Sequence, residues 1–233
     1  MTHLRTKAAL GLALAALLFA GGRQLLGSFA FHSADHPPSP SSTSQTSTAS
    51  RASSQQLAQL IISDGRPPVA GYIRTAYGQA WSDDVSVSGG HNGCDTRNDI
   101  LRRDAVTGTA VLKAGTHDCK VLSGKWISPY TGQPITQRSQ VQIDHIVPLA
   151  ESWRSGAYAW TADQRRNFAN DPAELLAVDG ESNQAKSDKA PQEWAPAIGR
   201  CRYAQRWVTV KSTYRLTVTT AERAALADLL RTC

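Results

Sequence analysis

The stretch that decides the fold is an apolar run closed by proline, Gln142-Ile143-Asp144-His145-Ile146-Val147-Pro148-Leu149. Its apolar and β-branched residues predict a strand over residues 141–146. An acid directly before a histidine at the strand end places a carboxylate and an imidazole side by side. Such a pair can hold a divalent cation and activate a water molecule beside it. The stretch therefore indicates metal-assisted hydrolysis.

A second polar block follows downstream, Asn183-Gln184-Ala185-Lys186-Ser187-Asp188. Asn183 and Lys186 are three residues apart and share one face of a predicted helix. The Asn183 amide oxygen is the kind of ligand that a hard cation takes, and Lys186 adds a positive charge. Residues 175–178 form a short apolar run just before this helix and predict a second strand. Together with the Asp144-His145 pair, these residues indicate metal-assisted phosphodiester cleavage.

Each of these residues has an expected role and a plainer alternative. His145 is the expected general base, because an unperturbed pKa of about 6.5 leaves much of it neutral; the alternative is a histidine packed at a strand end. Asp144 is the expected metal ligand, or else an ion-pair partner of an arginine. Asn183 is the expected second ligand, or else a helix cap. Lys186 is expected at the phosphate or leaving group, or else on the exposed helix surface.

The two blocks resemble the first and last parts of the HNH, or ββα-metal, endonuclease motif. More closely, residues 93–233 resemble secreted HNH-family proteins related to the C-terminal domain of GmrSD-type restriction enzymes. The pieces that carry the resemblance are Cys94-Asp95-Thr96-Arg97-Asn98, Gly115-Thr116-His117-Asp118-Cys119, the Asp144-His145 block, Asn170-Asp171-Pro172, Leu175-Leu176-Ala177-Val178 and Asn183-x-x-Lys186.

This resemblance implies an α+β fold with a ββα-metal core over about residues 120–190, and with inserted and C-terminal helices. It also implies an endonuclease acting on DNA, with RNA as a further substrate, that uses one Mg²⁺ or Mn²⁺ ion. No obligate protein partner is evident. The expected helices cover residues 55–62, 99–103 and 149–154, one opened by the capping box Thr161-x-x-Gln164, and a last one opened by Thr219-x-x-Glu222.

The chain departs from the family pattern at the start of the second strand, where Glu174 stands in place of the usual Asn. The family Asn steadies the loop and orients the catalytic His. Glu174 could accept a hydrogen bond from His145, and its charge would then raise the His145 pKa. Asn170 is the other candidate for this middle role.

Basic residues are the candidates for nucleic-acid contact: Arg97, which lies in a block that matches the family, Lys186, Arg165 and Arg166. The net charge of the chain is +6, but residues 1–54 hold four basic residues against one acidic residue. The charge balance of residues 55–233 therefore supports nucleic-acid binding only weakly. A solvated basic surface is the alternative, as is a salt bridge from Arg97 to Asp95 or Asp99.

Four cysteines in a chain with an export signal predict two disulfides. Three pairings are possible, and we favour Cys94–Cys119 with Cys201–Cys233 because each closes one compact segment. The spacings contain no Cys-x-x-Cys, so we expect no structural zinc.

The N-terminal segment has the pattern of an export signal. Arg5 and Lys7 precede an apolar run from Ala8 to Ala20, so residues 1–32 predict either a cleaved signal peptide or an uncleaved membrane anchor. Residues 33–54 are rich in Ser, Thr and Pro and predict a flexible tether. The nuclease domain is expected over residues 55–233, outside the cell or at the outer face of the cytoplasmic membrane.

Two rival functions belong to other classes. One is a non-catalytic nucleic-acid-binding or envelope module that keeps the HNH fold, and the Glu174 departure is its best support. The other is a hydrolase of another ester or amide. The chain has neither His-Glu-x-x-His nor Gly-x-Ser-x-Gly, which disfavours the second rival.

Overall fold

The computed structural model of the chain describes residues 42–65, 71–115 and 119–233. The expected signal or anchor segment, the first part of the expected tether, and residues 116–118 of the family-like block all lie outside the described residues. All described elements belong to a unit that spans residues 40–233. Among the described residues, none of the helices is both long and apolar enough to cross a membrane.

Helices and short antiparallel strands alternate along the chain, so the fold class is α+β, as predicted. The elements are, in order, α1 (Ser42–Gln59), η1 (Arg74–Tyr77), α2 (Thr96–Asp104), β1 (Val111–Leu112), β2 (Val121–Ser123), β3 (Trp126–Ile127), β4 (Pro134–Ile135), η2 (Arg138–Gln140), β5 (Val141–His145), α3 (Leu149–Arg154), η3 (Ala157–Ala159), α4 (Ala162–Ala169), β6 (Leu175–Asp179), α5 (Gly180–Lys186), α6 (Arg200–Thr213) and α7 (Thr220–Leu230).

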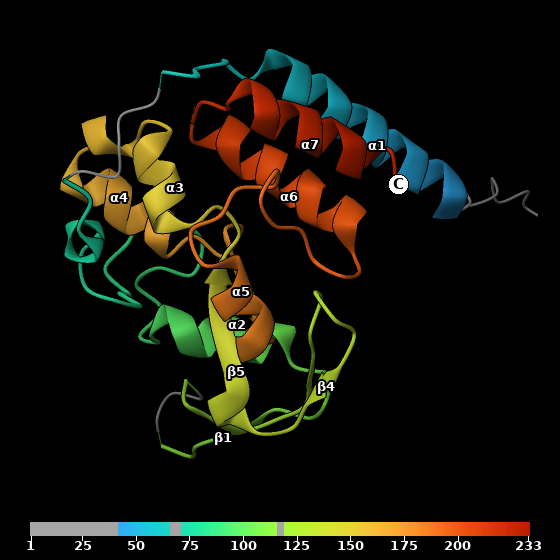
Figure 1. Cartoon of the computed structure of the whole chain (residues 1–233). Helices are drawn as coiled ribbons and strands as arrows, with labels where there is room; N and C mark the ends of the chain where they lie inside the picture. The colour runs from blue at the N-terminus through green and yellow to red at the C-terminus, as the bar shows by residue number, and fades with distance from the viewer. Residues whose placement is uncertain (1–41, 66–70, 116–118) are drawn as a thin grey trace, which may run out of the picture. The chain divides into compact units, whose positions relative to one another are not determined.

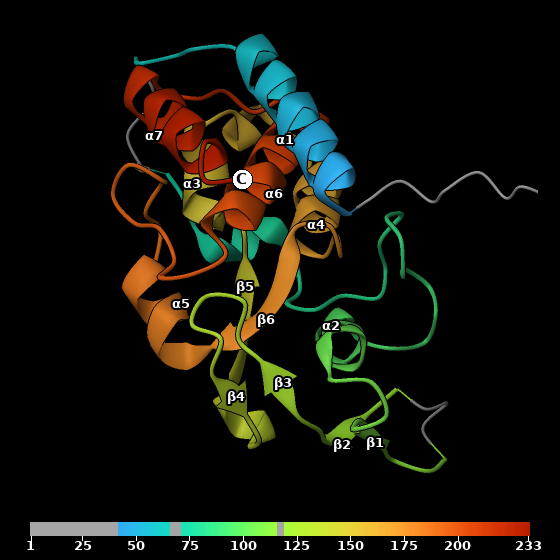
Figure 2. The same ribbon diagram turned by 90° about the vertical axis from the view of Figure 1, so that its right-hand side faces the viewer.

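The two predicted strands of the motif pair with each other. β5 and β6 are antiparallel, in a register that sets Val141 opposite Asp179 and His145 opposite Leu175 (Figure 2). Val141 and Ile143 are buried in a small core that also contains Trp126. Helix α5 follows β6 directly, and the Asp179 side chain caps it by accepting a hydrogen bond from the Ser182 amide at 2.7 Å. The expected order strand, strand, helix is therefore present.

Helices α1, α6 and α7 lie side by side in a separate layer (Figure 1). Tyr203 and Trp207 of α6 and Leu226 of α7 are buried in the larger hydrophobic core. The capping box predicted at Thr219 is formed, because its side chain accepts from the Glu222 amide and the Glu222 side chain accepts from the Thr219 amide. This layer is the C-terminal helical part expected from the sequence.

Helix α1 begins earlier than its sequence predicts. It starts at Ser42 rather than near Gln55, so the flexible tether expected over residues 33–54 is wrong for residues 42–54. The polar composition gave no apolar stripe before Leu57. In the structure Ser53 and Leu57 are buried, and α1 packs against α6 and α7. Packing against neighbouring helices overrides the weak local preference of a Ser- and Thr-rich segment.

The segment between the paired strands folds as predicted. Helix α3 has the predicted bounds, and α4 opens with the predicted capping box at Thr161. Together α3, η3 and α4 form the insertion between β5 and β6. The insertion returns to the sheet with Ala169, whose carbonyl contacts the end of β5.

β3 and β4 pair as an antiparallel hairpin, and β2 pairs with β1. Both favoured disulfides, Cys94–Cys119 and Cys201–Cys233, are present. The first ties Cys94, two residues before α2, to the segment that leads into β2, and the second ties the first turn of α6 to Cys233.

Candidate nuclease site

Asp144 and His145 do not lie side by side as predicted. Neighbouring residues of a strand point to opposite faces of the sheet, and their contacts follow this rule. Asp144 contacts Lys186 of α5, on the helix side. His145 contacts Ala169 and the ring of Trp81 on the other side. Both residues nevertheless line one pocket at the strand end.

Asp144 is buried and accepts hydrogen bonds at both carboxylate oxygens. Lys186 Nζ lies 2.9 Å from Oδ1, and the Tyr130 hydroxyl donates to Oδ2 at 2.5 Å. Lys186 also donates to the His145 carbonyl at 2.7 Å. The Lys186 side chain is fully buried, so the predicted contact from Lys186 to a phosphate is wrong. Lys186 instead holds the end of β5 in place through its contacts with Asp144 and the His145 carbonyl.

His145 is held in one orientation and one tautomer. Its Nε2 lies 2.9 Å from the Ala169 carbonyl oxygen. A carbonyl only accepts, so Nε2 carries the proton and Nδ1 of the neutral ring has the free lone pair. The Trp81 ring is stacked on the imidazole, with centroids 5.9 Å apart. Burial, aided by the nearby charges of Arg74 and Lys186, lowers the pKa of His145 to about 3, against the opposing Ala169 hydrogen bond.

Glu174 and Asn170 are both buried near His145. In the described part of the chain, neither side chain forms a hydrogen bond with the imidazole. The hydrogen bond expected between Glu174 and His145 is therefore absent. Glu174 accepts from the Val147 amide at 2.9 Å through its side chain and from the Ile146 amide at 2.8 Å through its carbonyl. Burial raises the pKa of Glu174 well above its usual value, although the Lys186 charge opposes this.

The family Asn would combine two tasks that are divided here. Glu174 steadies the loop after β5, and the Ala169 carbonyl orients His145. The Asn170 amide donates to the Arg166 carbonyl at 2.9 Å, and its Oδ1 is buried without a partner. The functional group that orients the ring is thus a backbone carbonyl, which no side-chain pattern can indicate.

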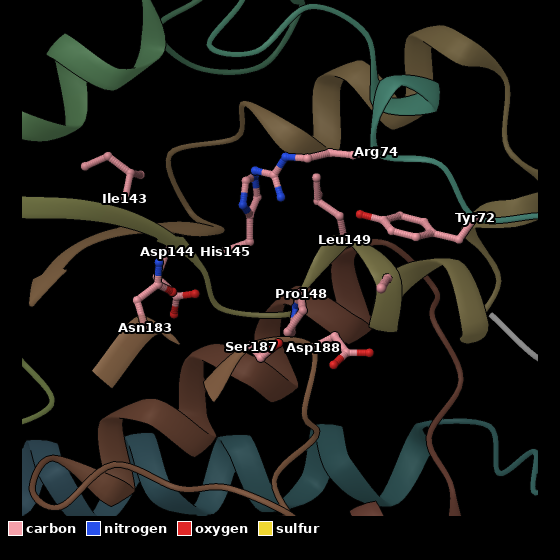
Figure 3. Close-up of a pocket in the computed structure, with 11 residues that line it drawn as sticks. Tyr72, Arg74, Ile143, Asp144, His145, Pro148, Leu149, Asn183, Ser187 and Asp188 are labelled. Atoms are coloured by element: carbon pink, nitrogen blue, oxygen red, sulfur yellow. The ribbon is translucent and has the colours of Figure 1, made fainter. Parts of the chain in front are cut away.

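Asn183 lies at the same pocket as Asp144 and His145. Its Nδ2 donates to Gln142 Oε1 at 2.8 Å, which leaves Oδ1 on the opposite side of the amide. The pocket has a volume of about 380 Å³. Figure 3 shows Asp144 and Asn183 together at one end, with the Arg74 guanidinium extended to the His145 ring.

The three arginines predicted to bind nucleic acid are all bound to protein groups. Arg97 donates to the Val141 carbonyl at 2.9 Å, and burial lowers its pKa. Arg165 donates to the carbonyls of Ala76 and Trp160. Arg166 forms ion pairs with Asp84 and Asp163. Each guanidinium therefore already has a protein partner, and phosphate contacts from Arg97, Arg165 and Arg166 stay a prediction.

Arg74 and Trp81 are site residues that no sequence pattern indicates. Arg74 is exposed and lines the pocket beside His145. Trp81 has a φ of 59°, a left-handed conformation that is uncommon outside glycine. Both lie before the two motif blocks and reach them only through tertiary structure. The hydrogen bond from Tyr130 to Asp144 is likewise a tertiary contact that no sequence pattern indicates.

The family model of "GmrSD restriction endonucleases, C-terminal domain" matches residues 95–229. The chain belongs to this family. It is also 41% identical over 202 residues to an uncharacterized secreted protein of Arthroderma benhamiae, with 84% of this chain and 92% of that protein covered. No solved structure matches the chain. The family is one of nucleases related to restriction enzymes, so membership indicates nuclease chemistry at a coarse level.

The GmrSD family match covers the paired strands and α5, and it includes one cysteine of each disulfide, Cys119 and Cys201, but it begins after Arg74 and Trp81. These two residues therefore lie outside the matched span. The relative from Arthroderma benhamiae matches over a longer stretch than the family model does.

The donor set at the first pocket fits a hard cation. Asp144 supplies a carboxylate, each oxygen of which has a second lone pair, and Asn183 supplies an amide oxygen. Among the described residues, no group of three or more His, Cys, Asp or Glu side chains is placed to hold a metal. Mg²⁺ commonly uses one or two protein oxygens and keeps several waters, so this sparse set suits Mg²⁺ or Mn²⁺ better than zinc.

Proposed function

We propose that this chain is an exported HNH endonuclease that hydrolyses phosphodiester bonds of DNA with one divalent cation and His145 as the general base. The observation that carries the proposal is the state of His145. Its Nε2–H is held by the Ala169 carbonyl, which leaves Nδ1 as the ring atom with a free lone pair, and the residue lines the polar pocket. An imidazole fixed in this way beside a polar pocket is the arrangement that proton abstraction from water needs.

The residues of this chain divide the work. His145 Nδ1 takes the proton from the attacking water, and the Ala169 carbonyl stabilises the imidazolium that forms. Arg74, exposed at the rim of the pocket, contacts the phosphate. Lys186 keeps Asp144 and the His145 backbone in place. Glu174 fixes the loop that follows His145.

Asp144 and Asn183 would hold the cation, Mg²⁺ or Mn²⁺. When bound, it neutralises the phosphate charge and stabilises the departing 3′ oxygen. The family description, which concerns restriction endonucleases, supports DNA as the substrate, and RNA is the further candidate. The apolar N-terminal run and the relative described as secreted support export. An uncleaved leader would leave the domain at the outer face of the membrane.

The experiment is cleavage of supercoiled plasmid by the purified oxidised protein, with and without chelator. We expect cleavage that chelator abolishes and that Mg²⁺ or Mn²⁺ restores. Asn183→Ala should raise the Mg²⁺ concentration for half-maximal cleavage, whereas Asn183→Asp should lower it or change the metal preference. Gln184→Ala, at an exposed neighbour on α5, is the matched control. Identical metal titrations for all variants would remove Asn183 from the site.

A second candidate is a non-catalytic nucleic-acid-binding module. The observation that favours it is that Lys186 and Tyr130 already engage both oxygens of Asp144. This candidate predicts binding of DNA that is unaffected by chelator, and no cleavage with any divalent cation. The same plasmid assay, read together with a gel-shift measurement, separates it from the endonuclease.

A further inference from the structure

A second pocket meets the first one at His145. Its volume is about 340 Å³, and Arg74, His145 and Leu149 line both pockets. A group bound in the second pocket would therefore lie next to a phosphate bound in the first. A substrate that fills both must place a polar, charged group next to a compact apolar one.

The walls of the second pocket are largely apolar and include two aromatic rings. Trp81 and Tyr77 line it, and the Trp81 ring is also stacked on His145. The Tyr77 hydroxyl is already bonded to the Leu149 carbonyl at 2.9 Å and to Ser152 at 2.6 Å. The left-handed backbone at Trp81 is strained, and such strain is found where a functional arrangement requires it. The aromatic lining suits a planar ring.

One polar side chain that lines this pocket has an atom without a hydrogen-bond partner. Asn170 lines it and is only 1% exposed, and its Oδ1 has no hydrogen-bond partner. Its Nδ2 is committed to the Arg166 carbonyl, which fixes the amide with Oδ1 as the remaining acceptor. A buried acceptor without a protein partner can accept a hydrogen bond from a donor group of a bound ligand. Nucleobases present N–H groups on an otherwise planar ring edge.

We propose that this second pocket receives the unstacked base of a nucleotide next to the scissile phosphate, with Trp81 as the stacking surface and Asn170 as the acceptor. This inference rests on the proposed function and names its substrate class, which is single-stranded or unpaired DNA. A base inside a duplex cannot enter without leaving the stack, which costs free energy. Single strands should therefore be cleaved faster than the matching duplex.

The test uses short single-stranded oligonucleotides with a single hydrolysable phosphodiester, the other linkages being methylphosphonates. The base is present on both sides of that bond, or absent from the 5′ or the 3′ nucleotide. For the wild-type protein, removal of the base on one side should lower kcat/KM about 5- to 150-fold, the range of one base–aromatic stack. Trp81→Ala should abolish this difference between substrates, and Trp81→Phe should keep it.

Binding gives a readout that does not require turnover. The intact and abasic oligonucleotides are bound to His145→Ala protein in chelator, and the intact one should bind more tightly by a similar factor. Equal cleavage and equal binding of all three oligonucleotides would overturn the base pocket. If the wild-type protein cleaves all three oligonucleotides equally and the His145→Ala protein cleaves none of them, the proposed function stands. Absence of cleavage of every substrate by wild-type protein would overturn both.

Discussion

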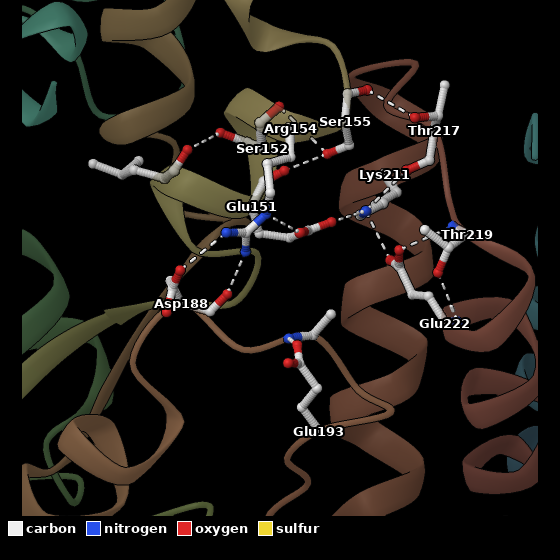
Figure 4. Close-up of polar contacts among 12 residues, drawn as sticks. Glu151, Ser152, Arg154, Ser155, Asp188, Glu193, Lys211, Thr217, Thr219 and Glu222 are labelled. Carbon is white, nitrogen blue, oxygen red and sulfur yellow. Dashed lines mark hydrogen bonds and ion pairs between the residues drawn. The ribbon is translucent and has the colours of Figure 1, made fainter. Parts of the chain in front are cut away.

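Two fully buried lysines organise two regions of this domain in different ways. Lys211, between α6 and its neighbours, lies 2.8 Å from a Glu151 carboxylate oxygen and 2.7 Å from one of Glu222, and donates to the Thr217 carbonyl (Figure 4). Lys186, at the candidate site, meets one carboxylate, that of Asp144, and one carbonyl. The first cluster joins helices, and the second ends at a pocket.

The side chains around Lys211 form several polar contacts each. Glu222 also accepts from the Trp207 indole at 2.7 Å and closes the capping box. Glu151 also pairs with Arg154, which bridges to Asp188 (Figure 4). In the described part of the chain, every buried side-chain nitrogen and oxygen atom of Lys211, Glu151 and Glu222 has a hydrogen-bond partner.

The site region is the opposite. Among the described residues, four buried side-chain atoms have no partner, and three of them belong to Arg166, Asn170 and Glu174 in the segment between β5 and β6. The fourth is the Tyr203 hydroxyl of α6, so unpartnered polar atoms occur in the helical core too, but most of them lie in the segment between β5 and β6. Such exceptions mark sites where a ligand or a reaction, rather than folding, sets the arrangement.

The largest expected effect on stability distinguishes the two lysines. Lys211→Met leaves two buried carboxylates without their cation, and we expect a loss of about 3–5 kcal/mol in the free energy of unfolding. Lys186→Met leaves one carboxylate, which keeps the Tyr130 hydrogen bond, so its loss should be smaller, about 1–3 kcal/mol. Denaturant unfolding of both variants measures the difference.

Lys189→Met is the control, because this lysine is exposed and one turn from Lys186. It should change the free energy of unfolding by no more than about 0.5 kcal/mol. The comparison fails if Lys186→Met is as destabilising as Lys211→Met, or if neither differs from the control.

Much of the fold follows from local patterns, because the relevant signals are local. The β-branched run of β5, the capping boxes of α4 and α7, and the turn before α5 each act within a few residues. The start of α1 at Ser42 depends on helices that come 150 residues later in the chain, so its own residues gave no indication.

The sequence indicates which residues lie together at the site, but it says less about what each residue does there. Asp144, His145, Glu174 and Lys186 do come together. Burial decides what each can do: it makes Lys186 a support for the strand end and keeps Glu174 away from the imidazole. A sequence pattern does not reveal burial of a charged residue, because Lys and Glu are usually exposed.

A smaller effect concerns Glu174 and pH. Its pKa in the folded protein is raised, so above the unfolded value of about 4.3 the unfolded chain releases this proton first. Stability is then lost as pH rises, by up to about 1.4 kcal/mol per pH unit until the folded pKa is reached. Glu174→Gln keeps an oxygen for the Val147 amide and removes this loss.

We therefore expect Glu174→Gln to melt at a higher temperature than wild type at pH 8, and the difference to shrink toward pH 4. Melting curves at several pH values measure it. Glu181→Gln, at an exposed glutamate of α5, is the control and should show no such trend. A difference that is constant with pH would contradict a protonated Glu174 in the folded state.

The central claim is that phosphodiester cleavage depends on His145, and the most direct test is the cleavage rate of His145→Ala at saturating Mg²⁺. His91→Ala, at an exposed histidine, is the matched control. We expect His145→Ala to be folded and about 10²–10⁴ times slower than wild type, as for the loss of a general base, and His91→Ala to cleave at the wild-type rate. A folded His145→Ala protein that keeps more than about a tenth of the wild-type rate would contradict the claim.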